Sequence, residues 1–378
     1  MKIIVLGAGL VGFPMAVDLS KDKNFNVTLV DIDKEKLGLS GKFPEIKTKI
    51  SDLSVKKNIL NLVKDQDMVI NAVPGFMGFE TLRTIIEAKK DVVDIAFFPE
   101  DPFLLDELAK ENGVRAVVDC GVAPGMSNMF SGYIEKKFDE IDSLVIYVGG
   151  LIEERKFPFE YKAVFSPVDV IEEYTRPARI IENGNLVIKE PLTEAELIEF
   201  PGVGTLEAFN SDGLRTLAYT IKGKDMKEKT LRYPGHIDKI ILLKKMGFFE
   251  TEKIDFNGCS VSPLDMSVKV IIPQWKFEES DRDITVMRIV FEGTEKGEKK
   301  RYTYDLYDRF DAETGTHSMA RTTGYTATVT ARLLAEGLYT REGISPPEFI
   351  GRENGCIEFV LNRLKDRGIE YTEKIESL

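Results

Sequence analysis

The segment that most constrains the fold is GAGLVG, which follows a short apolar run at the start of the chain and contains Gly7, Gly9 and Gly12. The run at residues 2–6 is continuous and rich in β-branched side chains, as is typical of a parallel strand that is covered on both faces. Residues 14–20 have apolar side chains at helical spacing, and the proline that opens them is tolerated in a first helical turn. Strand, glycine turn and helix in this order predict the first βαβ unit of a dinucleotide-binding sheet.

Each glycine of this segment has a steric role in such a unit. Gly7 permits a tight turn, Gly9 lets the backbone approach a pyrophosphate, and Gly12 lets the helix pack on the strand. A second apolar strand ends at Asp31, 19 residues after Gly12. A carboxylate at this place accepts hydrogen bonds from a free ribose 2′-OH and repels a 2′-phosphate, so the sequence favours NAD, although the lysines that follow leave NADP open.

Strand and helix patterns continue to alternate up to about residue 120. Further strands are expected at residues 68–73, 92–97 and 114–120, with helices between them. Alternation of this kind predicts a parallel sheet with a ligand crevice at the carboxyl ends of its strands. The loops at residues 72–78, 97–102 and 119–128 are rich in Gly and Pro, which makes them candidate cofactor loops, with ordinary turn chemistry as the alternative.

Beyond residue 130 the pattern changes to strands joined by hairpin turns. Residues 178–190 contain an Asn-Gly turn, and residues 284–310 predict a longer hairpin around a charged loop. Helices are expected again at 322–337 and 356–367. The predicted fold class is an α/β Rossmann dinucleotide-binding domain plus an α+β domain with an open, mainly antiparallel sheet.

The C-terminal helices are expected to return to the nucleotide domain and make it discontinuous. Residues 1–125 and 320–378 then form the NAD-binding Rossmann domain, and residues 126–319 form an α+β substrate-binding and dimerisation domain. The strand edges of such a second domain favour a homodimer or a higher homo-oligomer.

Composition excludes several function classes. A formal net charge of −12 opposes binding to a phosphate backbone, so nucleic acid is not expected as a partner. No apolar run approaches the ~20 residues of a membrane span, and no signal-peptide pattern opens the chain, so a cytoplasmic protein is expected. The cysteines, Cys120, Cys259 and Cys356, are too scattered for a disulfide framework or a metal cluster.

The second domain carries the candidate acid–base and carboxylate-binding groups. The chain has two histidines, His236 and His317, and either could be a general base near neutral pH, although a lone histidine is more often structural. Arginines in this half could hold a substrate carboxylate bidentately, with a plain ion pair as the alternative. Arg321 is the strongest of them because it stands at a predicted helix start beside Thr322.

Six segments together resemble one family: GAGLVG, DCGVAPGMSN, EAFNSDGLRTL, MKEKTLRYPGH, SMARTTGYTAT and GISPPEFIG. They resemble the saccharopine dehydrogenase-like group, and most closely the L-lysine 6-dehydrogenases within it. The resemblance extends from residue 2 to about residue 367. It implies NAD-linked oxidation of the ε-amino group of lysine to the 6-semialdehyde, which cyclises to piperideine-6-carboxylate, with release of ammonia.

The resemblance also implies roles for individual residues. Asp119 and His236 are the two candidates for the catalytic base. Residues expected on the substrate side are Asp212, Arg215, Arg232, Arg321 and Thr322. Residues expected to bind the cofactor are Gly7, Ala8, Gly9, Leu10, Val11, Gly12, Asp31, Asp52, Val73, Pro74, Cys120 and Gly121.

The substrate is less constrained than the cofactor. Residues 150–198 and the hairpin around Gly297 match no family motif. A saccharopine or carboxynorspermidine type dehydrogenase or reductase is therefore the alternative within the family. A non-catalytic module that senses NAD is the alternative outside it, because fold alone does not establish activity.

Overall fold

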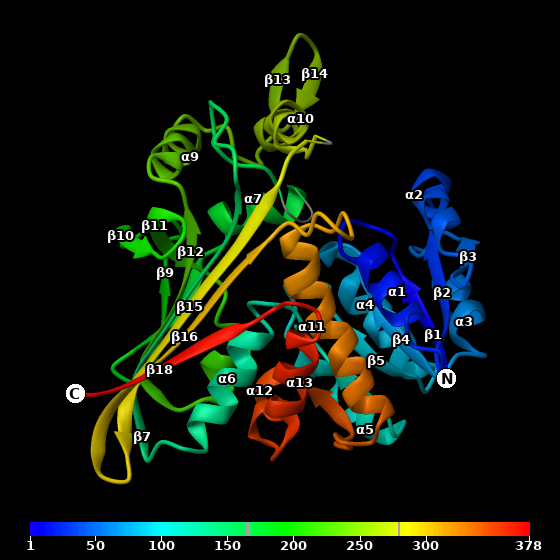
Figure 1. Cartoon of the computed structure of the whole chain (residues 1–378). Helices are drawn as coiled ribbons and strands as arrows, with labels where there is room; N and C mark the ends of the chain where they lie inside the picture. Colours follow the sequence, from blue (N-terminus) through cyan, green and yellow to red (C-terminus); the bar gives the residue numbers. More distant parts are fainter. Residues whose placement is uncertain (164–166, 279) are drawn as a thin grey trace. The chain divides into compact units, whose positions relative to one another are not determined.

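A computed structural model of the protein describes residues 1–163, 167–278 and 280–378, which divide into two compact units (Figure 1). The first unit comprises Met1–Asp139 and Met319–Glu370, and the second comprises Glu140–Ser318 and Tyr371–Leu378. The chain therefore passes from one unit to the other three times.

The first unit is built on a seven-stranded sheet in which all neighbouring strands are parallel, in the order β17-β6-β5-β4-β1-β2-β3. The strands are β1 (Lys2–Leu6), β2 (Asn26–Asp31), β3 (Lys47–Ile50), β4 (Met68–Asn71), β5 (Asp91–Asp94), β6 (Arg115–Val117) and β17 (Gly343–Ser345). The central strand β1 is apolar and fully buried after its first residue, which explains its continuous apolar sequence.

Helices follow most strands of this sheet. They are α1 (Gly12–Ser20), α2 (Lys34–Gly38), α3 (Lys56–Val63), α4 (Gly75–Glu87), α5 (Asp106–Glu111), α6 (Met126–Glu135), α11 (Ser318–Ala335), α12 (Pro347–Arg352) and α13 (Cys356–Lys365), with 3₁₀ turns at Leu39–Lys42 and Pro102–Leu105. A core of Val, Ile, Leu and Phe side chains fills the space between the sheet and helices α3, α4 and α5. Alternating strands and helices thus give the predicted Rossmann-type unit.

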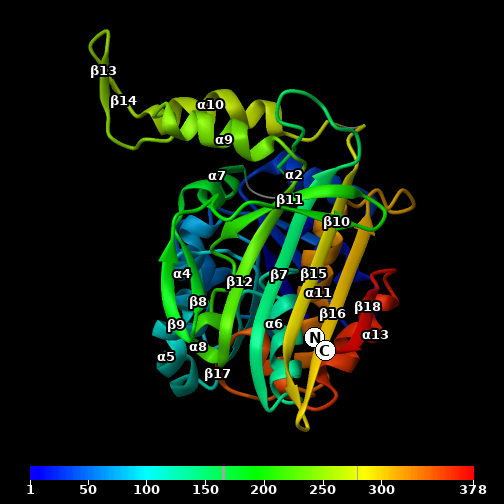
Figure 2. The ribbon, with the colours of Figure 1, turned by 90° about the vertical axis from the view of Figure 1, so that its left-hand side faces the viewer.

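The second unit is built on a nine-stranded mixed sheet whose main path is β10-β11-β12-β7-β15-β16-β18. Its strands are β7 (Glu140–Ile152), β8 (Ala178–Glu182), β9 (Asn185–Lys189), β10 (Glu196–Phe200), β11 (Gly204–Ser211), β12 (Gly223–Arg232), β15 (Asp283–Glu295), β16 (Glu298–Arg309) and β18 (Tyr371–Ser377). The long strands β12, β7, β15 and β16 lie side by side in Figure 2. Only the β12–β7 pair is parallel among these ladders, so the predicted open, mainly antiparallel sheet is confirmed.

The remaining elements of the second unit are helices and a separate hairpin, and three of the helices share an aromatic core. They are α7 (Pro167–Thr175), α8 (Leu217–Thr220), α9 (His236–Lys245), α10 (Pro263–Trp275) and a separate hairpin of β13 (Ile254–Phe256) and β14 (Cys259–Val261) at the start of α10 (Figure 2). Trp275 at the end of α10 is fully buried, and Tyr161, Tyr174 and Phe209 belong to the same cluster. This core holds α7, α9 and α10 on one another.

Two observed boundaries differ from the expected ones. The first unit extends to Asp139 rather than to residue 125, because α6 packs directly on α12 of the same unit. A methyl group on Gly132 would lie 2.0 Å from the carbonyl oxygen of Glu348, and one on Gly351 would lie 2.0 Å from that of Met129. The glycines therefore let the two helix backbones touch.

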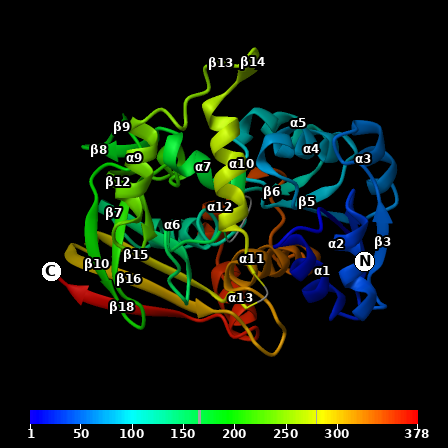
Figure 3. The same ribbon diagram turned by 90° about the horizontal axis from the view of Figure 1, so that it is seen from above.

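The C-terminal strand is the second difference. Residues 320–378 were expected to lie entirely in the nucleotide domain, but β18 pairs with β16, from Lys300 opposite Ser377 to Leu306 opposite Tyr371. Figure 3 shows β18 beside β16 at this edge of the sheet. The expected hairpins at 178–190 and 284–310 are both present, as β8–β9 and β15–β16.

Candidate functional site

The glycine turn of the first unit has the geometry that the sequence predicts. Gly7 has a φ of +104°, and a methyl group on it would lie 2.5 Å from the carbonyl oxygen of Ala72. A methyl group on Gly12 would lie 2.0 Å from the carbonyl oxygen of Gly7. Gly9 has no atom within 4 Å of that position, so the turn is tight on its inner side and open at Gly9. This open backbone fits the approach of a pyrophosphate.

Asp31 is held in place by the backbone on both sides. Its Oδ2 accepts a hydrogen bond from Ala8 N–H at 2.7 Å, and its Oδ1 accepts one from Asp33 N–H at 2.9 Å. The side chain stands at the carboxyl end of β2, where a dinucleotide of this fold places its adenine ribose. Beside it, Leu10 is half exposed and Val11 is the N-cap of α1.

The other expected cofactor residues follow the ends of β3 and β4. Asp52 lies just beyond β3 and accepts hydrogen bonds from the N–H and the hydroxyl of Ser54, which lower the pKa of its carboxyl. Val73 is buried, and Pro74 is the exposed N-cap of α4. All of these residues stand at the carboxyl edge of the parallel sheet.

The loop after β6 contains the expected residues Asp119, Cys120 and Gly121. Asp119 is buried and adopts a φ of +52°, which is uncommon for a residue with a side chain. Burial raises the pKa of the Cys120 thiol to about 12, so the thiol stays protonated and donates to Thr330 Oγ1 at 3.3 Å. A methyl group on Gly121 would lie 3.1 Å from Thr323 Cγ2, which places this loop against the start of α11.

Arg321 and Thr322 belong to the first unit, on α11. One guanidinium nitrogen of Arg321 donates to the carbonyl oxygen of Arg367 at 3.0 Å. Thr322 is fully buried, and its hydroxyl donates to the Met319 carbonyl at 3.4 Å. Both side chains are engaged within the unit, so their expected role in binding a substrate stays a prediction.

A buried pair at the same sheet edge is missing from the expected site residues. Asn71 ends β4 and Asp94 ends β5, and both are fully buried. Asn71 Nδ2 donates to Asp94 Oδ2 at 2.6 Å, and Ala96 N–H donates to Asp94 Oδ1 at 2.6 Å. The sequence signal was a polar residue that closes an apolar strand, in MVIN and in DVVD.

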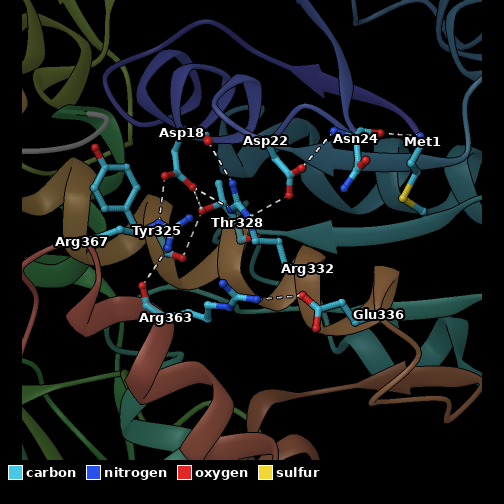
Figure 4. A network of polar contacts seen from close by, with 10 residues as sticks. All are labelled: Met1, Asp18, Asp22, Asn24, Tyr325, Thr328, Arg332, Glu336, Arg363 and Arg367. Atoms are coloured by element: carbon cyan, nitrogen blue, oxygen red, sulfur yellow. Dashed lines mark hydrogen bonds and ion pairs between the residues drawn. The ribbon is translucent and has the colours of Figure 1, made fainter.

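A second unexpected feature is the network around Asp18 on α1 (Figure 4). Asp18 Oδ2 accepts from Arg332 Nη1 at 2.8 Å and from the Thr328 hydroxyl at 2.6 Å, and Oδ1 accepts from Arg367 Nε at 2.8 Å. Burial alone raises the pKa of this carboxyl, but the charges of Arg332 and Arg367 outweigh burial and hold it below its ordinary value. The network ties the cofactor helix α1 to α11 and to the segment after α13.

The second unit brings four of the expected residues to β11, β12 and the turns that follow them. Asp212 follows β11, and both of its carboxylate oxygens pair with the guanidinium of Arg179 at 2.8 Å. Arg215 is buried in the same loop with a φ of +51°. Arg232 ends β12, and His236 opens α9.

Arg232 and His236 are joined by a buried chain of hydrogen bonds through Tyr174. His236 Nδ1 lies 2.9 Å from the carbonyl oxygen of Phe159, so Nδ1 carries the proton and Nε2 accepts from the Tyr174 hydroxyl at 3.0 Å. The Tyr174 oxygen in turn accepts from Arg232 Nε at 3.3 Å. Burial and then the charge of Arg232 lower the pKa of His236 to about 3, so the ring is neutral at physiological pH.

The remaining contacts of Arg232 leave none of its nitrogens without a partner. Nη2 donates to Glu173 at 2.6 Å and Nη1 donates to the Leu231 carbonyl, while the guanidinium lies 4.5 Å from the centre of the Tyr161 ring. A substrate carboxylate would have to displace Glu173 to bind here. His317, the other histidine, pairs with Asp283 at 3.0 Å.

Glu228 is a buried acid that sequence reasoning missed. It stands on β12, on the face that also carries Thr230 and Arg232, and accepts from the Ser211 hydroxyl at 2.6 Å. Burial raises the pKa of its carboxyl to about 8. The sequence K-E-K around it is typical of a solvated strand, so nothing local indicated burial.

Two classes of site are not found among the residues that the structure describes. No group of three or more His, Cys, Asp or Glu side chains could hold a metal ion within the described residues. No helix in the described part of the chain is both long and apolar enough to cross a bilayer.

Comparisons with known proteins place the chain in a family. The saccharopine dehydrogenase NADP binding domain matches residues 3–117, and the saccharopine dehydrogenase C-terminal domain matches residues 121–369. The chain belongs to the saccharopine dehydrogenase family. The predicted resemblance to this family is thereby confirmed.

Relatives in the family have different lengths and names. The mitochondrial alpha-aminoadipic semialdehyde synthase of Mus musculus is 26% identical over 70% of this chain, but the match spans only 30% of that longer protein. The carboxyaminopropylagmatine dehydrogenase of a Synechocystis strain is 23% identical over 91% of both chains. Both are named for the chemistry of amino-containing compounds.

A solved structure shows that the fold is shared. The apo saccharopine dehydrogenase (L-Glu forming) of Saccharomyces cerevisiae superposes with a TM-score of 0.80 over 99% of both chains, at 18% identity. The predicted combination of a Rossmann-type unit with a second unit built on an open sheet is confirmed by this match. The expected closeness to L-lysine 6-dehydrogenases stays a prediction.

Proposed function

We propose that this saccharopine dehydrogenase-family chain catalyses the NAD-dependent oxidative deamination of the ε-amino group of L-lysine. In the balanced reaction, lysine, NAD⁺ and water give the 6-semialdehyde, NADH, an ammonium ion and a proton. NAD, when bound, would supply the acceptor for the hydride of C6, and the semialdehyde would cyclise to piperideine-6-carboxylate with loss of water. The protein must bind the amine, orient C6 and accept a proton from nitrogen.

The glycine turn and Asp31 support a dinucleotide with a free 2′-OH. The backbone at Gly9 is open to a pyrophosphate, and α1 begins three residues later. Asp31 is ordered by Ala8 N–H, so its carboxylate keeps a fixed position at the end of β2. A 2′-phosphate at that position would meet this negative charge, which supports NAD over NADP.

The observation that carries the choice of substrate is the charge balance of the second unit. Arg179 is paired with Asp212 and Arg232 with Glu173. Carboxylates thus occupy these guanidinium groups. Arginines that are already paired in this way suit lysine, which carries two ammonium groups and one carboxylate, better than saccharopine, which carries three carboxylates.

Of the two expected bases, Asp119 fits the reaction better than His236. Asp119 stands at the carboxyl edge of the first sheet, in the loop that contains Gly121. Both ring nitrogens of His236 are engaged, and a pKa of about 3 makes it a weak proton acceptor. We therefore propose that Asp119 accepts the amine proton and that His236 holds Tyr174 and Arg232 in place.

The test is the growth of NADH absorbance with purified protein, NAD and one amine at a time. Lysine alone is expected to give turnover, with NADP giving at least tenfold lower kcat/KM. Asp119→Asn should lower kcat by about 10² or more, as for loss of a general base. Asp139→Asn, which changes an exposed carboxylate of the same unit, serves as the control.

A second candidate is a dehydrogenase that acts on a carboxylated polyamine or on saccharopine. It is favoured by the match to the carboxyaminopropylagmatine dehydrogenase over 91% of both chains. Turnover with such a secondary amine and not with lysine would select it. NAD binding without turnover on any amine would instead indicate a sensing module.

The cellular location and the oligomeric state are part of the same proposal. We infer a cytoplasmic protein that forms a homodimer or a higher homo-oligomer. The assembly is supported by the sheet of the second unit, whose path of described strands ends in β10 and β18, because terminal strands of open sheets can pair with another copy. Light scattering on a size-exclusion column tests the assembly, and a monomer at micromolar concentration would refute it.

A further inference from the structure

A loop of the second unit rests on the carboxyl group of Glu228. A methyl group on Gly213 would lie 2.3 Å from Glu228 Cδ and 2.4 Å from its Oε2, so a larger residue at this position would displace the Glu228 carboxyl. Ser211, at the start of the loop, donates its hydroxyl to Glu228 Oε2 at 2.6 Å. The Thr230 hydroxyl lies 2.8 Å from Ser211 Oγ and extends the cluster along β12.

The same loop carries residues of the expected substrate side. Asp212 lies between Ser211 and Gly213 and is fixed by both oxygens to Arg179 of β8. Arg215 follows with the left-handed backbone that the turn requires. Glu228 therefore supports a short loop that carries two charged side chains of the proposed site, Asp212 and Arg215.

We propose that Glu228 is a positioning residue whose uncharged carboxyl holds loop 211–215 in the form that binds substrate. The neutral form suits this place because the loop packs on the carboxyl and because the charges of Glu173 of α7 and Asp212 favour it, while the charge of Arg232 opposes it. Glu173 and Asp212 are themselves paired with Arg232 and Arg179. A carboxylate here is repelled by those acids, and the loop must lift to let water reach it. The proposal rests on the proposed function for the identity of the substrate and for the place of loop 211–215 in the substrate site.

The pKa of Glu228 near 8 places its titration in an accessible range. Because this pKa is raised above the value of an unfolded glutamate, the stability that the neutral carboxyl contributes is present at low pH and is lost as pH rises through about 8. Above that pH the loop should loosen, and the KM for the amine should rise more than kcat falls.

Two variants separate this role from a merely structural one. Glu228→Gln keeps the shape and stays neutral, so its KM and its melting temperature should show no step near pH 8. Ser211→Ala removes a hydrogen bond that lowers the pKa of Glu228, so the step should move to higher pH. Asp225→Asn, which removes a carboxylate from the same strand away from the loop, should follow the wild type.

The experiment measures the KM for lysine and the melting temperature of the full chain between pH 6 and 10. A step in the wild type that is absent in Glu228→Gln and displaced in Ser211→Ala supports the proposal. The proposal is overturned if KM and melting temperature depend on pH in the same way in the wild type and in Glu228→Gln. If Glu228→Gln does not fold, a step at the same pH in Ser211→Ala as in the wild type overturns it. The melting temperature is measured without substrate. If lysine is not the substrate, the pH dependence of KM cannot be measured, but the step in melting temperature remains.

Discussion

Replacing Asp18 by Asn should destabilise the first unit strongly, because it leaves two arginines beside a neutral group. Asp18 is 2% exposed, and its carboxylate accepts three side-chain hydrogen bonds, from Arg332, Thr328 and Arg367. Removing one partner of a buried ion pair costs about 3–5 kcal/mol. A unit of about 150–250 residues loses about 2–4 °C of melting temperature per kcal/mol. The expected drop is therefore about 6–20 °C.

The assay is thermal unfolding at pH 7 followed by circular dichroism, with Asp22→Asn as the control. Asp22 lies 4.0 Å from Arg332 and its side chain is 32% exposed, so its loss should cost less than about 1 kcal/mol. Since the folded pKa of Asp18 lies below its ordinary value of 3.8, its contribution is complete at neutral pH and is lost only as pH falls through the folded pKa. A drop for Asp18→Asn no larger than that for Asp22→Asn would refute the reasoning.

Three further outcomes are expected. Gly12→Ala places a methyl group 2.0 Å from the Gly7 carbonyl oxygen and should cost about 1–3 kcal/mol and weaken NAD binding, measured by melting and by titration calorimetry. Asp31→Asn removes the charge at the end of β2, so the dissociation constant of NADP divided by that of NAD should fall; an unchanged ratio contradicts the assigned role of Asp31. His236→Leu should lower the melting temperature because Tyr174 loses its acceptor, at a cost of about 1–3 kcal/mol, while kcat changes only a few-fold; a loss of about 10² in kcat would restore His236 as a base.

Local patterns predicted the parts of the fold that depend on neighbours in sequence. The strand and turn at residues 2–12 were readable because glycine is the residue that tolerates the contacts made by Gly7 and Gly12. The Asn183–Gly184 turn was equally readable, since both residues have a positive φ and sit between β8 and β9.

Contacts between segments that are distant in sequence could not be predicted from local patterns. The strand β18 has an alternating, charged sequence with exposed side chains, and only its ladder with β16 reveals its place. α6 joins the first unit through Gly132 and Gly351, which are separated by more than two hundred residues. A single sequence shows such small residues but not their partners.

The protonation states and the burial of charged groups in the candidate site also depend on contacts that are distant in sequence. Asp31 could be assigned because its role depends on spacing alone, whereas the state of His236 depends on Phe159 and Tyr174, which close both sides of its ring. Glu228 and Asp18 were overlooked because each looks like a surface acid in its own segment. Their burial follows from Ser211 and Gly213 in one case and from Arg332 in the other.

The threading of the chain through both units bears on how the protein is made. A ribosome that has reached residue 318 has released most of the second unit, yet that unit still lacks β18, and the first unit lacks Met319–Glu370. Until the last residues have emerged, β16 lacks its partner strand β18, and Asp18 lacks Arg332 and Arg367. Neither half can mature alone on the ribosome, so premature termination near residue 318 should yield a product for chaperones and proteases rather than a working domain.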